Sequence, residues 1–226
     1  MGLSCIFQNL NGQNNPNNSQ ALTDREKQIV AISAFTAKGD QAGLSAALHD
    51  GLDAGLTINE AKEILIHLYA YCGFPRSLNG LSTLQAVLEQ RKQNAIEDKV
   101  GKEASPLPTN KTKEELGSDV LVQLVGTSEA TGVRQFAPLV DAFLKAHLFG
   151  DIFGRDVLDF QSREIATISA LASMQDTESQ LGSHLKVAQN IGMTHEQLKD
   201  IALEIAIKIG WQEGQIIKKK MKKYGS

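Results

Sequence analysis

The segment from Phe149 to Trp211 carries three consecutive helix patterns with their start and stop signals, so it commits this part of the chain to a helical fold. The first helix is expected over 162–174, where apolar residues recur at helical spacing. The second should begin near Asp176, a good N-cap residue, and stop at Gly192, which tolerates a left-handed C-cap. The third should start at the capping-box pattern that opens with Thr194.

The first half of the chain contains signals of the same kind. Capping boxes at Thr23–Glu26 and Thr57–Glu60 predict two helices, and another helix is expected over 41–54 between them. Pro75 forbids a continuous helix, so the chain should turn there and form a fourth helix over 77–90.

The two halves are copies of one unit. Gly55–Thr57 corresponds to Gly192–Thr194. Arg25–Glu26 likewise corresponds to Arg163–Glu164. A repeat of this length indicates a duplicated domain rather than a solenoid. We therefore expect the two repeats to pack as a pseudo-dimer.

A charged stretch separates the repeats and contains Ser105-Pro-Leu-Pro108, which is typical of a linker. Further helices are expected over 113–124 and 134–149. The second should have one apolar face, made of Phe136, Leu139, Val140, Phe143 and Leu144. The sequence shows no strand alternation, so the expected fold class is all-α. The expected organisation is a disordered N-terminus over 1–21, a first repeat over 22–91, a linker over 92–118, a second repeat over 119–217 and a basic tail over 218–226.

Composition argues against two classes of partner. The net charge is −3 and the only lysine run is the C-terminal tail, whereas binding nucleic acid requires a basic face. No apolar stretch reaches the roughly 20 residues of a membrane-spanning helix. We therefore expect a soluble protein with no nucleic-acid partner and no membrane span.

Cys5 and Cys72 lack metal or redox spacing, so we expect reduced thiols and no metal site. Cys5 precedes a polar run over 8–20 that contains six asparagines and cannot bury enough surface to fold. This start fits a cytoplasmic protein with a floppy N-terminus. It fits equally an exported or periplasmic protein whose signal segment was removed before residue 1.

The run FGDIFGRDVLDFQSREIATISALA, followed by LGSHLKVAQNIGMTHEQLKDI, resembles the carboxymuconolactone decarboxylase family of the alkylhydroperoxidase D-like superfamily. Its members share a phenylalanine-glycine-aspartate lead-in, an arginine-glutamate helix and a histidine helix that ends in glycine-x-threonine. The resemblance extends over most of 22–217 and implies a duplicated, all-α, alkylhydroperoxidase D-like fold.

The redox members of this superfamily place a CxxC pair just before the histidine. The matching positions in this chain are Thr177 and Gln180. Without a thiol there is no sulfenate or disulfide chemistry. A thiol peroxidase is therefore not expected.

His184 is the first candidate catalytic residue. It shares a helix face with Leu181 and Ala188, and such apolar surroundings would lower the pKa of its imidazole and leave a base or acid that works near pH 7. The residues alone also fit a core histidine bonded to a backbone carbonyl. The family histidine to which His184 corresponds favours the catalytic interpretation.

Arg163 and Glu164 are the next candidates. Glu164 faces Ile168 and Leu171, an unusual place for a carboxylate unless it is paired. Arg163 could bind a substrate carboxylate through two parallel hydrogen bonds. The alternative for both is an ordinary helix N-terminus, in which Glu164 favours the helix dipole and Arg163 is solvated.

Glu63, His67 and Tyr71 follow one another at intervals of four beside the apolar face of one predicted helix. A surface Glu–His pair, with Tyr71 as packing, is the plain alternative. The pattern Tyr-x-Gly-x-Pro resembles the family motif at this helix end, which implies that Tyr71 lines a pocket. Arg76 follows directly and is a second candidate anchor for a carboxylate.

The two repeats lack complementary parts. Repeat one has Ala47 where repeat two has His184. Repeat two has Glu204 and Lys208 where repeat one has His67 and Tyr71. We infer one composite site per chain, with a symmetric second site that has decayed, and expect His184 and Tyr71 to share a pocket.

The resemblance implies cofactor-free decarboxylation of a small carboxylated lactone in the catabolism of aromatic compounds. His184 would be the acid, Glu164 would orient it, and Arg163 or Arg76 would bind the anion. Two alternatives stay open: another lyase or isomerase on the same scaffold, and a non-catalytic protein that binds small molecules or serves assembly. The resemblance also implies a homo-oligomer, most simply a trimer of two-repeat chains that imitates a ring of six single repeats.

Overall fold

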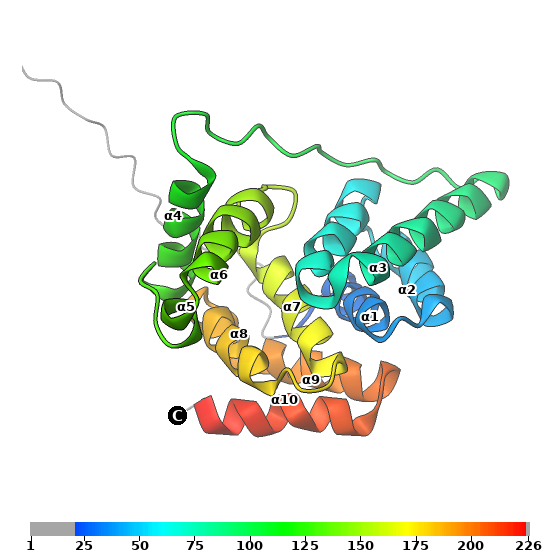
Figure 1. Ribbon diagram of the computed structural model, residues 1–226. Coiled ribbons are helices and arrows are strands. Elements are labelled where there is room, and N and C mark those ends of the chain that lie inside the picture. Colours follow the sequence, from blue (N-terminus) through cyan, green and yellow to red (C-terminus); the bar gives the residue numbers. More distant parts are fainter. Residues whose placement is uncertain (1–20, 225–226) are drawn as a thin grey trace, which may run out of the picture.

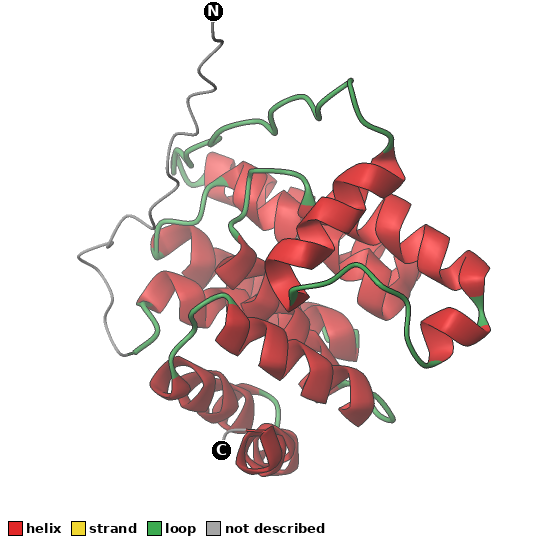
Figure 2. Cartoon of the chain, turned by 90° about the vertical axis from the view of Figure 1, so that its left-hand side faces the viewer, coloured by secondary structure: helices red, strands yellow, loops and turns green. Residues whose placement is uncertain are grey.

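The computed structural model describes residues 21–224, all of them in helices or the segments between them (Figures 1 and 2). The predicted disordered N-terminus lies outside this range apart from residue 21, as does Cys5. The elements are α1 (Asp24–Lys38), α2 (Gln41–Asp53), α3 (Ile58–Gln93), α4 (Lys113–Val125), α5 (Val133–Phe136), α6 (Pro138–Phe143), the π-helix η1 (Leu144–Phe153), α7 (Phe160–Ser173), α8 (Glu178–Asn190), α9 (His195–Lys208) and α10 (Trp211–Tyr224). No helix in the described range is long and apolar enough to cross a bilayer.

The helix starts that carry a capping box were predicted correctly. Thr23, Thr57 and Thr194 each accept a hydrogen bond from the backbone N–H three residues on, and the side chain at that position bonds back to the backbone of the threonine. Gly39 and Gly192 take the left-handed conformation just beyond α1 and α8, with φ values of 77° and 90°.

The predicted break near Pro75 is present inside α3. The non-helical residue is Gly73, with φ 83° and ψ 157°, two positions before the proline. Pro75 has no backbone N–H to donate to the preceding turn, and Gly73 supplies the positive φ that the break needs. α3 is therefore two helices, so α1, α2 and the two parts of α3 correspond in order to α7, α8, α9 and α10.

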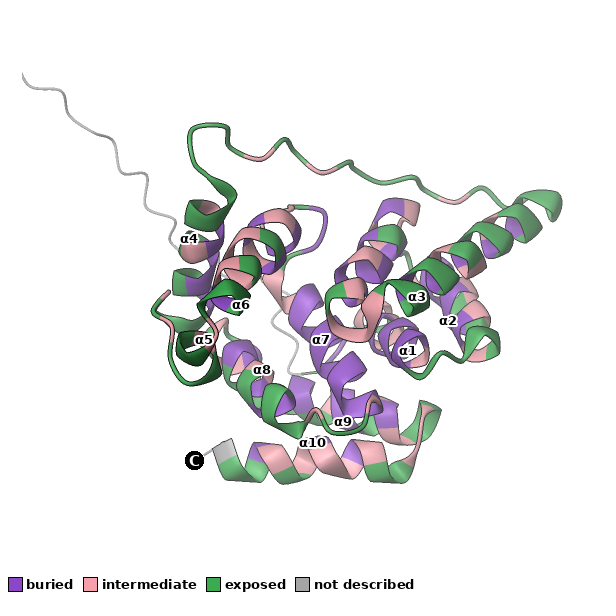
Figure 3. Ribbon diagram, viewed as in Figure 1, coloured by how far each residue is buried: buried purple, intermediate pink, exposed green. Residues whose placement is uncertain are grey.

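The two repeats pack as a duplicated, all-α pseudo-dimer. α1 and α7, which occupy equivalent positions in the two repeats, lie against each other at its centre (Figure 1). α1 also contacts α9, and α7 contacts α3 in the equivalent way. One continuous core joins the repeats and includes the fully buried Ile29, Ile32, Ile165 and Ile168. The burial pattern in Figure 3 places this core along α1 and α7.

Two details of the predicted helices were wrong. Asp176 does not cap α8, because it adopts a positive φ of 59° in the turn before it. Thr177 occupies the N-cap position instead, and its hydroxyl donates to the carbonyl of Leu171 at 2.6 Å rather than to the helix.

The predicted helix over 134–149 is interrupted. Ala137, which precedes Pro138, is extended with φ −125° and ψ 80°, so α5 ends there and α6 starts at the proline. Apart from Leu144, which packs against a smaller buried cluster, the apolar face that we predicted is not in the core. The exposed fractions are 88% for Phe136 and 63% for Phe143.

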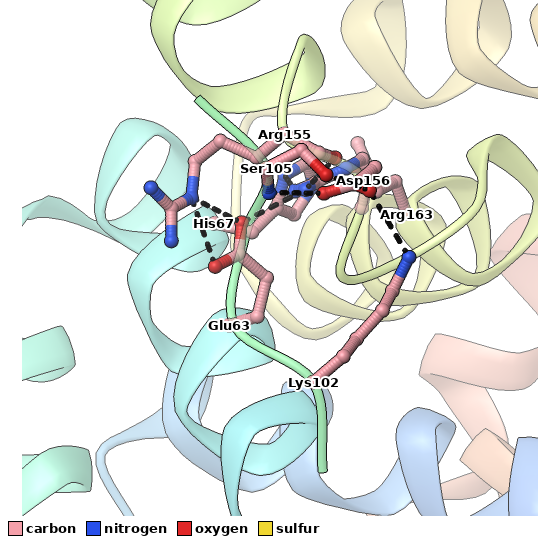
Figure 4. A network of polar contacts seen from close by, with 8 residues as sticks. Glu63, His67, Lys102, Ser105, Arg155, Asp156 and Arg163 are labelled. Atoms are coloured by element: carbon pink, nitrogen blue, oxygen red, sulfur yellow. Dashed lines mark hydrogen bonds and ion pairs between the residues drawn. The ribbon is translucent and has the colours of Figure 1, made fainter. Parts of the chain in front are cut away.

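The connection between α3 and α4 makes ion pairs and hydrogen bonds with both repeats. Arg91 is buried and pairs with Asp53 and Asp98, which holds the end of α3. Further along, the backbone N–H and hydroxyl of Ser105 both donate to Asp156, at 2.8 and 2.9 Å. These bonds lower the pKa of Asp156 to about 2. The connection thus crosses from α3 to the loop before α7 (Figure 4).

Candidate functional site

His184 and Glu164 form a hydrogen-bonded pair between α8 and α7. Nδ1 of His184 lies 2.9 Å from Oε2 of Glu164. The Glu164 side chain is fully buried, whereas that of His184 is 16% exposed. A carboxylate in this position holds the imidazole in one orientation and leaves Nε2 available to accept or donate a proton. The expected pairing of Glu164 is present, and the partner of His184 is a carboxylate rather than a backbone carbonyl.

The histidine pair meets the α3 residues of the other repeat. The rings of His184 and Tyr71 make an edge-on contact, with 5.5 Å between centroids and 77° between planes. Tyr71 also contacts the ring of His67 at 5.2 Å. His67 in turn contacts Phe153 at 5.1 Å. The structure therefore brings His184 and Tyr71 into contact across the repeats, well within the span of one small molecule.

An ion-pair network of Glu63, Arg155 and Arg163 lies beside His67 (Figure 4). Nη2 of Arg163 donates to Oε1 of Glu63 at 2.8 Å and to the carbonyl oxygen of Arg155 at 2.9 Å. Nε of Arg155 bonds both oxygens of Glu63 at 3.0 Å. Glu63 and Arg163 are almost completely inaccessible. The alternatives of a surface Glu–His pair and a solvated Arg163 are therefore both wrong.

His67 links this network to α7. Its Nε2 lies 2.8 Å from Oγ1 of Thr167, and its Nδ1 lies 3.4 Å from Nη1 of Arg163. Burial lowers the pKa of His67 well below its usual value, and the nearby charge of Arg163 lowers it further. His67 is thus a neutral imidazole near pH 7.

Three polar atoms in this group are buried without a hydrogen-bond partner in the described part of the chain. They are Oη of Tyr71, Oε1 of Glu164 and Nε of Arg163. Buried polar atoms are normally satisfied, so such a concentration marks a place that can receive polar groups of a ligand. Burial raises the pKa of the Tyr71 phenol, and the Glu164 carboxylate raises it further, so Tyr71 stays neutral.

The two predicted arginine anchors are not placed as direct anchors. The carboxylate at the guanidinium of Arg163 is Glu63 rather than a ligand, and Arg163 has no exposed surface. Arg76 is exposed and lies over the α1–α2 turn, where a Cβ added to Gly39 would be 4.0 Å from its Nε. Its side chain lines a shallow surface depression with Asp40 and Asn79 instead of joining the histidine group.

Sequence reasoning missed Arg155 and Thr167. Arg155 belongs to the phenylalanine-glycine-aspartate lead-in segment. Its position in the sequence does not predict a bond to Glu63, which is 92 positions away. Thr167 lies one turn after Arg163 on α7 and could have been grouped with it by helical spacing. Both contacts cross the repeat interface, which no single-helix pattern reveals.

The described residues include no candidate metal-binding cluster, and their cysteine is poorly suited to thiol chemistry. They hold no cluster of three or more His, Cys, Asp or Glu side chains suited to a metal ion. Cys72 is half-buried, its Sγ lies 3.2 Å from the carbonyl of Leu68, and burial raises the pKa of its thiol. Such a thiol is a poor nucleophile.

Comparison with family models gives one match in two parts. The model described as the carboxymuconolactone decarboxylase family matches residues 7–86 and 138–213. The two segments together cover more than half of the chain and fall one in each repeat. No curated protein matches the sequence.

Proposed function

Because the chain belongs to the carboxymuconolactone decarboxylase family, we propose that it is a lyase that removes carbon dioxide from a small carboxylated lactone or a related acid without a cofactor. The observation that carries this proposal is the pair of His184 and Glu164, with 2.9 Å between Nδ1 and Oε2. A buried carboxylate behind a partly accessible imidazole is the arrangement of an oriented acid–base residue.

The reaction requires a proton and a place for electrons. As carbon dioxide leaves, the bonding electrons move into the conjugated lactone carbonyl and form a dienolate. His184 would return a proton to carbon through Nε2, and Glu164 would hold the imidazole and stabilise its charged form. The surrounding core residues Leu181 and Leu185 are buried, which keeps water away from this side of the pair.

Arg163 is better suited to support the site than to bind the substrate carboxylate directly. A tight ion pair with the departing carboxylate would stabilise the ground state and oppose its loss. In the structure, Arg163 is bonded to Glu63, lies beside His67 and packs over the ring of Phe153, 5.8 Å from its centroid. Glu63 and His67 accordingly support the site without lining it. Tyr71 is the α3 residue whose ring contacts His184.

The test is a screen of small carboxylated lactones and 2-oxo acids for release of carbon dioxide. We expect His184→Gln and Glu164→Gln to lower turnover by about 10²- to 10⁴-fold, the usual contribution of a general acid–base residue. His49→Gln is the matched control, because His49 is partly exposed and its recorded side-chain bond in the described structure is to Gln90, away from Glu164. Release that persists in His184→Gln would overturn the assignment.

A role in assembly is supported by a separate observation and is compatible with catalysis. Large apolar side chains on α5 and α6 are exposed to solvent, with exposed fractions of 88% for Phe136 and 66% for Leu139. Apolar groups on this scale usually mark an interaction surface. We propose that the chain forms a homo-oligomer, most simply a trimer of two-repeat chains.

A further inference from the structure

The hydrogen-bond directions around His67 follow from the donor chemistry of arginine. A guanidinium has no acceptor, so the contact of 3.4 Å between Nη1 of Arg163 and Nδ1 of His67 requires Nδ1 to accept. His67 is neutral, so its single ring hydrogen is on Nε2. That hydrogen faces Oγ1 of Thr167 at 2.8 Å, and the threonine oxygen accepts it.

The hydroxyl hydrogen of Thr167 is then left to donate elsewhere. Three other buried hydroxyls, on Thr36, Ser169 and Ser173, donate to the carbonyl four residues earlier in their helices. In the described structure Thr167 makes no such bond to the carbonyl of Arg163. The Thr167 hydroxyl is near enough to the phenol of Tyr71 to oppose the rise of that pKa. The Thr167 hydrogen is therefore free to turn toward Oη of Tyr71, which is buried without a hydrogen-bond partner in the described structure.

The phenol of Tyr71 is the end of this chain of donors. Its oxygen is buried and lacks a partner of its own, and its ring touches that of His184. An oxygen that receives a hydrogen from Thr167 must direct its own hydrogen away from Thr167. A neutral phenol held in this way is suited to donate to a negative oxygen beside the imidazole.

We infer that Tyr71 donates a hydrogen bond to the anionic oxygen that develops on the substrate, and that Arg163, His67 and Thr167 are positioning residues that fix the direction of this donation. The identity of that anion as a lactone dienolate rests on the function proposed above. We call the series of hydrogen bonds from Arg163 through His67 and Thr167 to Tyr71 the relay. The ion pairs of Arg163 with Glu63, and of Glu63 with Arg155, hold Arg163 in place at its start.

The tautomer of His67 tests the relay without any catalytic assay. In ¹⁵N-labelled protein at pH 7, the ring signals of His67, assigned by their loss in His67→Gln, should show hydrogen on Nε2 and a bare Nδ1. Hydrogen on Nδ1, or a charged ring, would overturn the relay. Thr167→Val should shift the Nε2 resonance, and Thr167→Ser should restore it.

Binding of tetronate, a stable lactone enolate, tests the donation by Tyr71. We expect Tyr71→Phe to weaken binding by about 10- to 100-fold, the usual effect of losing one hydrogen bond to a charged group. Tyr69→Phe is the matched control, because the Tyr69 ring stacks on Phe74 at 4.3 Å, away from His184. Thr167→Val should weaken binding less, and adding it to Tyr71→Phe should have no further effect.

Two outcomes separate this inference from the proposed function. Tetronate binding that depends on Tyr71, in a protein that releases no carbon dioxide from any lactone, would uphold the inference and refute the lyase. Equal affinity of the wild type and Tyr71→Phe for tetronate, or no binding by either, would overturn the inference whatever the enzyme assay shows.

Discussion

The guanidinium of Arg163, in the second repeat, bonds the carboxylate of Glu63, in the first, at 2.8 Å across the centre of the molecule. Their side chains are 0% and 2% exposed, so the pair is removed from solvent. Removing one member of a buried pair leaves the other as an uncompensated charge, which costs far more than the net stability of the pair itself. This contact therefore ties the repeats together and fixes α3 relative to α7.

The first prediction concerns this pair. Arg163→Met should lower the free energy of unfolding by about 3–5 kcal/mol, because it leaves Glu63 buried with only Arg155. Arg25→Met is the matched control: Arg25 occupies the equivalent position in the first repeat, but its pair with Glu60 is partly exposed, so the cost should be about 0–1 kcal/mol. Urea unfolding of the two variants measures the difference, and equal losses would contradict it.

The fold was largely predictable because local signals and the global arrangement agree. Thr23, Thr57 and Thr194 define helix starts whose energetics are local, so a single sequence reveals them. The alignment of the two halves then predicted the pseudo-dimer. The helix predicted over 134–149 is interrupted because Pro138 inside it cannot continue a helix from the residues before it, which the apolar spacing alone did not reveal.

The candidate site was only partly predictable because its contacts cross between repeats. The complementary losses in the two halves pointed to His184 beside Tyr71, and the rings do touch. Helical spacing could not show that Arg163 would be occupied by Glu63. Nor could it show that the sharp turn at Gly73 would carry Arg76 toward the α1–α2 loop, away from the histidine.

The second prediction concerns acid stability. His67 has a lowered pKa in the folded protein, so between that value and the usual pKa of about 6.5 the unfolded chain binds the extra proton. Stability should therefore be full above about pH 6.5 and fall as the pH drops below it, by up to about 1.4 kcal/mol per pH unit from this group. His67→Gln should flatten the dependence between pH 6.5 and 5 in urea titrations. An unchanged slope would show that His67 is not the group responsible.

The third prediction concerns the stability of His184→Ala. An imidazole that only faced a pocket would leave few contacts behind, so its removal would cost little stability. In the structure, however, Glu164 is fully buried and its Oε2 bonds His184. Removing the imidazole should cost about 1–3 kcal/mol, the penalty of an unsatisfied buried acceptor. The double variant His184→Ala/Glu164→Leu should recover part of this loss in thermal unfolding, and a double variant less stable than the single one would contradict the argument.

The fourth prediction concerns thiols. Thr177 and Gln180 stand where redox relatives have cysteines, and the Cys72 thiol is held neutral by burial. Iodoacetamide at pH 7.5 should therefore modify Cys72 slowly in the native protein and rapidly in urea, as measured by mass spectrometry of its peptide. Cys72→Ser should retain any lactone-directed activity, and loss of that activity with the fold intact would contradict the thiol-independent mechanism.

The fifth prediction concerns assembly through two apolar surfaces that the repeat relates. On the second repeat, Leu203, Ile207 and Trp211 are 47%, 65% and 67% exposed. By the alignment of Thr57 with Thr194, Trp211 corresponds to Phe74, which is 61% exposed on the first repeat. Phe74 borders a groove of about 470 Å³ that Val140, Phe143 and Leu144 also line. The chain thus presents apolar surface at two equivalent places, at Trp211 and at Phe74, and α6 and η1 complete the surface at Phe74.

Two such surfaces on one chain allow each copy to contact two others, which is what a closed ring requires. Light scattering at micromolar concentration should return the mass of three chains. Phe143→Asp and Trp211→Asp should each shift it toward one chain, because a charge buried in an apolar contact is costly. Val122→Asp is the matched control, since Val122 is 49% exposed on α4, outside both surfaces. A wild-type mass of one chain would refute the ring, and a trimer unaffected by either aspartate would place its contacts elsewhere.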